Sequence, residues 1–198
     1  MRSPPALVPS TRQALLDAAV ELFLTQGVEA TSMDQVRSAA GASNGSLYHH
    51  FPTRNHLART IYEAALRDYQ ANLRGALGDK LSAQQGVQNL VKRHIAWVRR
   101  SPQQARVLHE LRASTVIEGL EPDWEQANAA AYSSIKAWVA RHVAEGTMQD
   151  LPFEVWMALV FGPALQLTPR WAREEAARVP TRVINALAQA AWRSVNRP

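Results

Sequence analysis

The sequence of 198 residues predicts an all-α protein of about nine helices, in one domain or two small ones. Apolar residues recur three and four positions apart along most of the chain, and no segment shows the alternation of a strand. Capping residues and glycines separate these segments at intervals typical of helices. Near residues 32–51, a short helix, a turn containing glycine and a second helix follow one another. This pattern predicts a helix-turn-helix, which forms an N-terminal group of three helices with the helix before it and is followed by further helices toward the C-terminus.

The first helix is predicted over residues 11–26. Ser10 and Gln13 have the spacing of a capping box, and Gly27 supplies the left-handed residue that ends a helix. The predicted inner face consists of apolar residues at helical spacing, Leu15, Ala18, Ala19, Leu22 and Phe23. We interpret this helix as a brace for the helix-turn-helix.

The first helix of the helix-turn-helix is expected to begin at Thr31 as N-cap, with Asp34 completing a capping box. Gly41 is expected to end it. Ser43 is then expected to cap the second helix, in which the side chains of Leu47 and Phe51 would point inward.

The outer face of that second helix is expected to carry small polar and flat aromatic side chains. Gly45 costs roughly 1 kcal/mol in a helix interior relative to alanine, and close approach to a phosphate would explain that cost. After Pro52, Thr53 is expected to cap the next helix. An ordinary helical hairpin is the alternative for a turn of this kind, but these features favour a DNA-binding function.

Residues 10–69 resemble the N-terminal domain of the TetR family of transcriptional regulators. The resemblance is carried by TRQALLDAAVELFLTQG, by ATSMDQVRSAAG and above all by GASNGSLYHHFPTRNHL. It covers about a third of the chain, and beyond residue 75 only length and helical character agree. Asn44 stands where the family commonly has lysine, and Arg54 replaces another lysine, so the resemblance does not imply a particular operator sequence.

The resemblance implies a regulator, more often a repressor, that binds a palindromic DNA operator as a homodimer. We expect a DNA-binding domain over residues 9–69, with the helix-turn-helix at 32–51, and an effector-binding and dimerisation domain over 70–198. The side chains expected near base edges are Ser43, Asn44, Ser46 and His49. Those expected at phosphates are Thr31, Gly45, Tyr48, Thr53 and Arg54.

Helices are predicted in the rest of the chain over 53–77, 82–100, 102–117, 123–145, 152–167 and 179–195. Aromatic and polar residues in this part suggest a pocket for a small apolar or aromatic effector, such as TetR-like proteins use. The candidate lining residues are His94, Trp97, His109, Arg112, Trp138, Trp156 and Phe161. The alternative is that the aromatic residues are plain core.

The last two helices carry more apolar surface than the terminal helices of a monomer need. Two helices from each of two chains would form a four-helix dimer interface. The predicted interface residues are Phe161, Ala164, Leu165, Ile184, Leu187, Ala188, Ala191 and Trp192.

Composition limits the other possibilities. The formal net charge is +5, but residues 1–80 hold eight Lys and Arg against seven Asp and Glu, so bulk charge does not support DNA binding and the motif alone does. There is no cysteine, no signal peptide and no apolar run of membrane length, so we expect a cytoplasmic protein. No catalytic motif is present, and we predict no enzyme activity, no cofactor and no metal site.

Two alternatives to a regulator with an effector stay open. One is a helical small-molecule-binding protein or enzyme that keeps the N-terminal domain without its DNA function, which Asn44 and the near-neutral charge of that domain favour. The other is an architectural DNA-binding protein without effector control, whose binding would be salt-sensitive and nearly independent of sequence.

Overall fold

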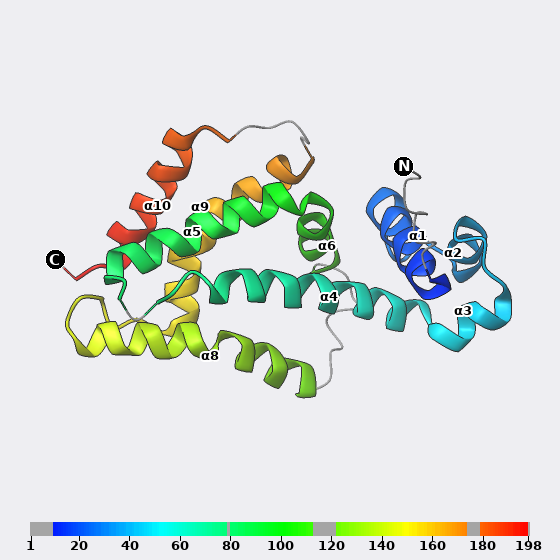
Figure 1. Ribbon diagram of the computed structural model, residues 1–198, viewed down its shortest axis with the longest axis horizontal. Helices are drawn as coiled ribbons and strands as arrows, with labels where there is room; N and C mark the ends of the chain where they lie inside the picture. The colour runs from blue at the N-terminus through cyan, green and yellow to red at the C-terminus, as the bar shows by residue number, and fades with distance from the viewer. Residues whose placement is uncertain (1–9, 79, 113–121, 174–178, 198) are drawn as a thin grey trace, which may run out of the picture. The chain divides into compact units, whose positions relative to one another are not determined.

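The computed structural model describes residues 10–78, 80–112, 122–173 and 179–197, without the side chains of residues 112 and 122–131. This described part forms nine helices and no strand, and one isolated bridge joins Met148 to Asn196 (Figure 1). The all-α prediction is confirmed. The helices are α1 (Thr11–Gln26), α2 (Met33–Ala39), α3 (Asn44–His50), α4 (Arg54–Arg74), α5 (Ala83–Arg100), α6 (Pro102–Arg112), α8 (Pro122–Ala144), α9 (Phe153–Arg173) and α10 (Thr181–Val195).

The chain divides into two compact units, and the boundary falls inside α4 between Ala64 and Ala65. The first unit holds α1 to α3 and the start of α4, together with the end of α6 from Glu110. The second unit holds the other described residues. The functional division into residues 9–69 and 70–198 stays a prediction.

In the first unit, α1 packs against α2 and α3. Apolar side chains from all three helices fill the space between them, because each helix has one apolar face. Arg12, near the start of α1, places its guanidinium carbon 5.4 Å from the centre of the Phe51 ring at the end of α3, in a cation–π contact. The buried side chains are Leu15, Ala19, Phe23, Val36, Leu47 and Phe51.

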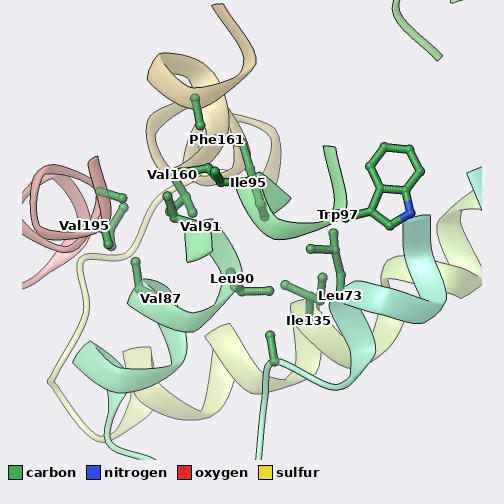
Figure 2. Packing of buried hydrophobic residues seen from close by; sticks show 14 of the residues in the cluster. Leu73, Val87, Leu90, Val91, Ile95, Trp97, Ile135, Val160, Phe161 and Val195 are labelled. Atoms are coloured by element: carbon green, nitrogen blue, oxygen red, sulfur yellow. The ribbon is translucent and has the colours of Figure 1, made fainter. Parts of the chain in front are cut away.

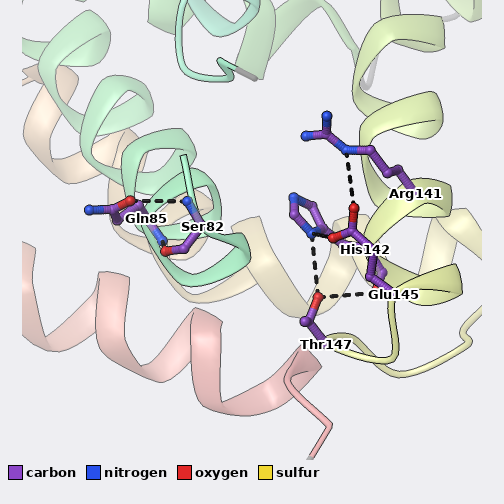
Figure 3. Close-up of polar contacts among 6 residues, drawn as sticks. All are labelled: Ser82, Gln85, Arg141, His142, Glu145 and Thr147. Atoms are coloured by element: carbon purple, nitrogen blue, oxygen red, sulfur yellow. Dashed lines mark hydrogen bonds and ion pairs between the residues drawn. The ribbon is translucent and has the colours of Figure 1, made fainter. Parts of the chain in front are cut away.

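In the second unit, α5 packs against both α9 and α10, and these two helices also pack against each other. Figure 2 shows the core between them, to which α4 and α8 also contribute. The first turn of α5 is fixed by a capping box, in which Ser82 and Gln85 exchange hydrogen bonds of 3.0 and 3.2 Å (Figure 3). Core residues labelled in Figure 2 are Leu73, Val87, Leu90, Val91, Ile95, Trp97, Ile135, Val160, Phe161 and Val195.

The helix α9 is longer than predicted, because it continues past residue 167 and through Pro169. A proline inside a helix removes one backbone hydrogen bond and usually ends or kinks the helix. Here the last turn is held by packing, since Trp171 and Ala172 are buried in the core. Tertiary burial therefore outweighs the local preference of Pro169.

Two prolines, Pro163 and Pro169, lie inside α9. Neither has a backbone N–H, so the carbonyls four residues earlier, at Leu159 and Leu165, lack their usual intrahelical donor. The side chains of Leu159 and Leu165 are 37% and 41% exposed. Six residues correspond to about 120° around the helix axis, so α9 has two separate places where an exposed apolar side chain belongs to a residue whose carbonyl lacks its usual helical donor.

None of the described helices is long and apolar enough to cross a membrane. The described side chains also contain no group of three or more His, Cys, Asp or Glu placed to hold a metal ion.

Candidate nucleic-acid interface

The helix α2 begins one residue later than predicted. Ser32 is its N-cap: the Ser32 hydroxyl accepts from the Gln35 backbone N–H at 3.1 Å, and the Gln35 amide oxygen accepts from the Ser32 backbone N–H at 2.8 Å. The prediction that Thr31 and Asp34 form the capping box is therefore wrong. Two hydroxyl residues stand in sequence at this position, and local spacing does not decide between them.

Thr31 is instead buried, and its hydroxyl is hydrogen-bonded to the end of α1 and the residue after it. Its side chain is 1% exposed, its hydroxyl donates to the Gly27 carbonyl at 2.7 Å, and it accepts from the Gln26 amide at 3.1 Å. Because that hydroxyl is already hydrogen-bonded within the protein, the structure does not present the Thr31 side chain for the predicted phosphate contact.

The turn between α2 and α3 has the predicted glycine. Gly41 has a φ of +63°, the left-handed conformation that suits glycine at the end of a helix. Ala42 closes the turn with a backbone hydrogen bond of 3.0 Å to the Arg37 carbonyl. The turn therefore fixes the direction in which α3 leaves α2.

The helix α3 is anchored as predicted. The Ser43 hydroxyl accepts from the Ser46 backbone N–H at 3.2 Å, which makes Ser43 the N-cap. Leu47 and Phe51 are fully buried. With its inner face fixed by these two side chains, α3 has a defined outer face.

That outer face is polar and open. Asn44, Gly45, Tyr48 and His49 are exposed, and Tyr48 is 53% exposed. Ser46, which was also predicted to lie near base edges, is half-buried. A Cβ atom at Gly45 would meet nothing within 4 Å, so packing within the protein does not require glycine there. The exposed predicted residues thus share one surface that is free to meet an outside partner.

At the start of α4, Thr53 is the predicted cap, and Arg54 makes hydrogen bonds within the protein that were not predicted. The exposed Thr53 caps α4, because its hydroxyl accepts from the His56 backbone N–H at 3.1 Å. Arg54 donates from Nη1 to the Glu29 carbonyl at 2.6 Å and, at 3.4 Å, to the carbonyl of Thr31. The guanidinium therefore ties α4 to the loop before α2, whatever further contact it makes.

Sequence reasoning missed the place of Arg12, which is exposed and lies over Phe51 at the end of α3. The positive charge of Arg12 lies close to the end of α3, where it would attract a phosphate group. Helical spacing alone gives no signal for this contact, because it depends on how α1 packs against α3.

The residues predicted to line an effector pocket differ in how far they are buried. His94, Trp97, Trp156 and Phe161 are each at most 2% exposed and pack in or against the core. Trp138 is 7% exposed. His109 is exposed, and the side chain of the seventh candidate, Arg112, lies outside the described residues.

His94 takes part in a chain of polar contacts within this core. Its Nδ1 lies 2.9 Å from the Tyr69 hydroxyl and its Nε2 lies 3.0 Å from the Thr168 hydroxyl, which itself donates to the Ala164 carbonyl at 3.1 Å. Burial lowers the pKa of His94 to about 4, so the ring is neutral at pH 7. Burial, together with nearby Tyr132, raises the pKa of Tyr69 well above its usual value.

The predicted dimer-interface residues also differ in how far they are buried within a single chain. Four of them are at most 2% exposed within a single chain, so their side chains fill that chain's own core. Leu165 is 41% exposed, and Ile184, Leu187 and Trp192 are partly buried against the core. The four buried residues are Phe161, Ala164, Ala188 and Ala191.

Comparison with known proteins agrees with this geometry. Residues 15–61 match the model of the family described as bacterial regulatory proteins, tetR family. The chain is 43% identical over 53 residues to the HTH-type transcriptional regulator AcrR of Shigella flexneri, covering 27% of this chain and 25% of that protein. It is 34% identical over 80 residues to the HTH-type transcriptional repressor KstR2 of Rhodococcus jostii, covering 40% of this chain and 39% of that protein.

The likeness of fold extends over nearly the whole chain. A TetR family transcription regulator from Marinobacter aquaeolei superposes with a TM-score of 0.81 at 18% identity, over 96% of this chain and 97% of that one. Sequence similarity is thus concentrated at α1 to α4, while the arrangement of helices is shared throughout. Residues 15–61 therefore carry the N-terminal helix-turn-helix region of the tetR family of bacterial regulatory proteins, and the described helices of the whole chain share the fold of TetR-family structures.

Proposed function

We propose that this protein is a transcriptional regulator that binds a palindromic operator as a homodimer. One observation carries the proposal: α3 is anchored by Leu47 and Phe51 and presents an open polar face with Tyr48 53% exposed. A short helix fixed after a glycine turn, with polar side chains outward, is the arrangement that enters the major groove in helix-turn-helix proteins.

Within this face we assign different contacts to different residues. Asn44 and His49 offer hydrogen-bonding groups for base edges, as do Ser43 and Ser46 at the start of the helix. Tyr48, Thr53 and the backbone at Gly45 are proposed to contact phosphates, which position the protein without reading sequence. Arg54 adds positive charge, but its hydrogen bonds to the Glu29 and Thr31 carbonyls give it mainly a structural role.

The dimer is proposed to form through the outer faces of α9 and α10. One reading helix covers only a few base pairs, whereas two related by a two-fold axis reach half-sites about 34 Å apart. Leu159 and Leu165 supply exposed apolar surface on α9, and the partly buried Ile184, Leu187 and Trp192 supply it on α10.

Control by a small apolar or aromatic effector in the second unit is also proposed. Such a ligand releases DNA only if it binds better to the conformation that fits the operator poorly. Because one of the relatives is named a repressor, we propose repression as the output.

Selection of bound fragments from random-sequence DNA at near-physiological salt tests the proposal. One enriched palindrome with half-sites about a helical turn apart is expected. Recovery of no enriched sequence would overturn specific regulation.

Matched variants make the selection specific to α3. Tyr48→Ala should abolish binding to the selected operator while the melting temperature is unchanged. His109→Ala, a change of an exposed ring elsewhere in the chain, should leave binding intact. If Tyr48→Ala binds the operator as the unchanged protein does, α3 is not the reading helix.

A further inference from the structure

The first unit has few positive charges with which to bind DNA. Residues 10–64 contain four arginines, no lysine and five acidic residues. Binding to a DNA backbone depends on cations that neutralise phosphates, and the salt dependence of binding reflects their number. In a domain with so few cations, the surroundings of each arginine decide whether it can reach a phosphate.

Three of the four arginines have other partners within the protein. Nε and Nη2 of Arg37 both lie 2.8 Å from a carboxylate oxygen of Asp34. Arg54 donates to two backbone carbonyls of the loop before α2, at 2.6 and 3.4 Å. Arg59 also has an interaction within the chain. The charge of these three side chains is therefore already engaged, in part or in full, without DNA.

Arg12 has different surroundings. It is exposed and lies in the first turn of α1. The contact that its guanidinium makes among the described residues is with the ring of Phe51, whose centre lies 5.4 Å from the guanidinium carbon. Residues 1–9, just before the described part of the chain, include no acidic residue. A cation–π contact does not satisfy the N–H donors of a guanidinium as a carboxylate does, so these donors can still bind an anion.

The Phe51 ring gives Arg12 a fixed position relative to α3. Phe51 is fully buried, and its backbone N–H donates to the Leu47 carbonyl at 2.8 Å as the C-cap of α3. The ring therefore cannot move independently of α3. Since the N-terminal residues of a reading helix contact base edges, Phe51 marks the end of α3 that lies toward the DNA backbone. The Arg12 guanidinium is thus held beside the end of α3 that a phosphate would approach.

We propose that Arg12 binds a backbone phosphate next to α3 and so positions the reading helix on DNA without reading its sequence. Arginine suits this contact because its planar guanidinium can give two parallel hydrogen bonds to one phosphate. A homodimer makes the contact twice, once in each half-site. This contact rests on the proposed function, since it belongs to the same DNA-binding surface.

The salt dependence of DNA binding tests the proposal, because each phosphate contact adds about 0.9 to the slope of log affinity against log salt concentration. Fluorescence anisotropy gives the dissociation constant of a labelled duplex between about 50 and 200 mM salt. In Arg12→Gln the slope should be shallower by about 0.9 per bound chain, or about 1.8 for a dimer. Arg12→Lys, which keeps the charge, should retain the slope.

A second measurement asks whether Arg12 reads sequence. The selected operator is compared with a variant operator that has one base pair changed in each half-site. Arg12→Gln should weaken binding to both by the same factor, because a phosphate carries no sequence information. A greater loss on the selected operator would mean that Arg12 contacts bases and would overturn the proposal.

Two controls separate a phosphate contact from a general effect. Lys92→Gln removes one positive charge from an exposed position of α5 and should leave the slope unchanged. The melting temperature of each variant is measured alongside, since loss of the ring contact alone can lower stability. A lower melting temperature with an unchanged slope in Arg12→Gln would assign Arg12 to packing on Phe51 and refute the phosphate contact.

The slope on a duplex of arbitrary sequence separates this contact from operator recognition. If selection enriches no operator but Arg12→Gln still changes that slope, sequence-specific regulation fails and the phosphate contact stands. If an operator is found and Arg12→Gln has the slope of the unchanged protein, only the phosphate contact fails. If no duplex is bound at all, both fail.

Discussion

The Nε2 atom of His94 lies 3.0 Å from the hydroxyl oxygen of Thr168, and this contact fixes the direction of a buried chain of hydrogen bonds. Thr168 has one hydroxyl proton, which it donates to the Ala164 carbonyl. It must therefore accept from Nε2–H, and Nδ1 must accept from the Tyr69 hydroxyl. The neutral ring satisfies both neighbours, whereas a protonated ring would require the Tyr69 hydroxyl to turn its proton away and accept from Nδ1–H.

This chain predicts a loss of stability in acid. The unfolded chain takes up a proton at His94 near pH 6.5, whereas the folded chain does so only near a pKa of about 4. The stability contributed by neutral His94 is thus complete above pH 6.5 and lost as the pH falls to 4, by about 3 kcal/mol in all. Urea unfolding at several pH values should show this loss.

The variant His94→Gln separates this effect from that of the acidic residues, which both proteins share. The difference in unfolding free energy between the two proteins should be constant above pH 7. It should shrink by up to about 1.4 kcal/mol per pH unit below pH 6. A difference that does not change with pH would mean that His94 titrates normally.

Replacement of Gly86 by alanine should destabilise the second unit by about 1–3 kcal/mol, because the added Cβ overlaps the Trp138 indole. Thermal or urea unfolding measures the loss. In a Trp138→Leu background the same replacement should cost much less, since the overlapping ring is gone. Equal costs in both backgrounds would show that overlap with the Trp138 indole is not the cause of the loss.

The opposite result is expected at Gly45. Alanine there meets nothing within 4 Å and has the better helix propensity, so stability should rise by up to about 1 kcal/mol. If the backbone at Gly45 approaches a phosphate, as proposed, operator affinity should fall in the same variant. Higher stability with unchanged affinity would refute the proposed contact but not the DNA-binding function.

Arg54→Ala should loosen the loop between α1 and α2, because it removes the donor to the Glu29 and Thr31 carbonyls. Arg54 is only half-buried, so we expect a loss of about 1 kcal/mol. Amide hydrogen exchange in the loop should accelerate, and Arg54→Lys should restore part of the protection. Unchanged exchange with weaker DNA binding would identify Arg54 as a phosphate contact alone.

Leu159→Glu should weaken the proposed dimer without lowering the stability of the monomer, since Leu159 is 37% exposed on α9. Light scattering after size-exclusion chromatography measures the shift in mass. Gln104→Glu adds the same charge at an exposed position of α6 and should leave the mass unchanged. A mass that is the same in all three proteins would move the interface away from α9.

Local signals in the sequence were enough where a residue acts on its own neighbours. Gly41 at the turn, Ser43 and Thr53 as caps, and the inward Leu47 and Phe51 are all as predicted. Each depends on spacing within about one helical turn, which the sequence displays directly.

Predictions that depend on tertiary packing were less complete. Whether Thr31 or Ser32 caps α2 depends on the polar groups that surround the turn, and α9 passes Pro169 because Trp171 and Ala172 are buried. The effector candidates were chosen by residue type, but His94, Trp97 and Phe161 lie in the core.

The two prolines of α9 bear on how selective a partner must be. An outer face made of leucine side chains alone would accept many apolar surfaces in several alignments, because hydrophobic contact has no direction. Carbonyls at Leu159 and Leu165 that lack a helical donor do have a direction, and they lie six residues apart on the same helix. A partner that packs over either position must bring a donor to that carbonyl or leave it open to water, so only a few alignments are favourable.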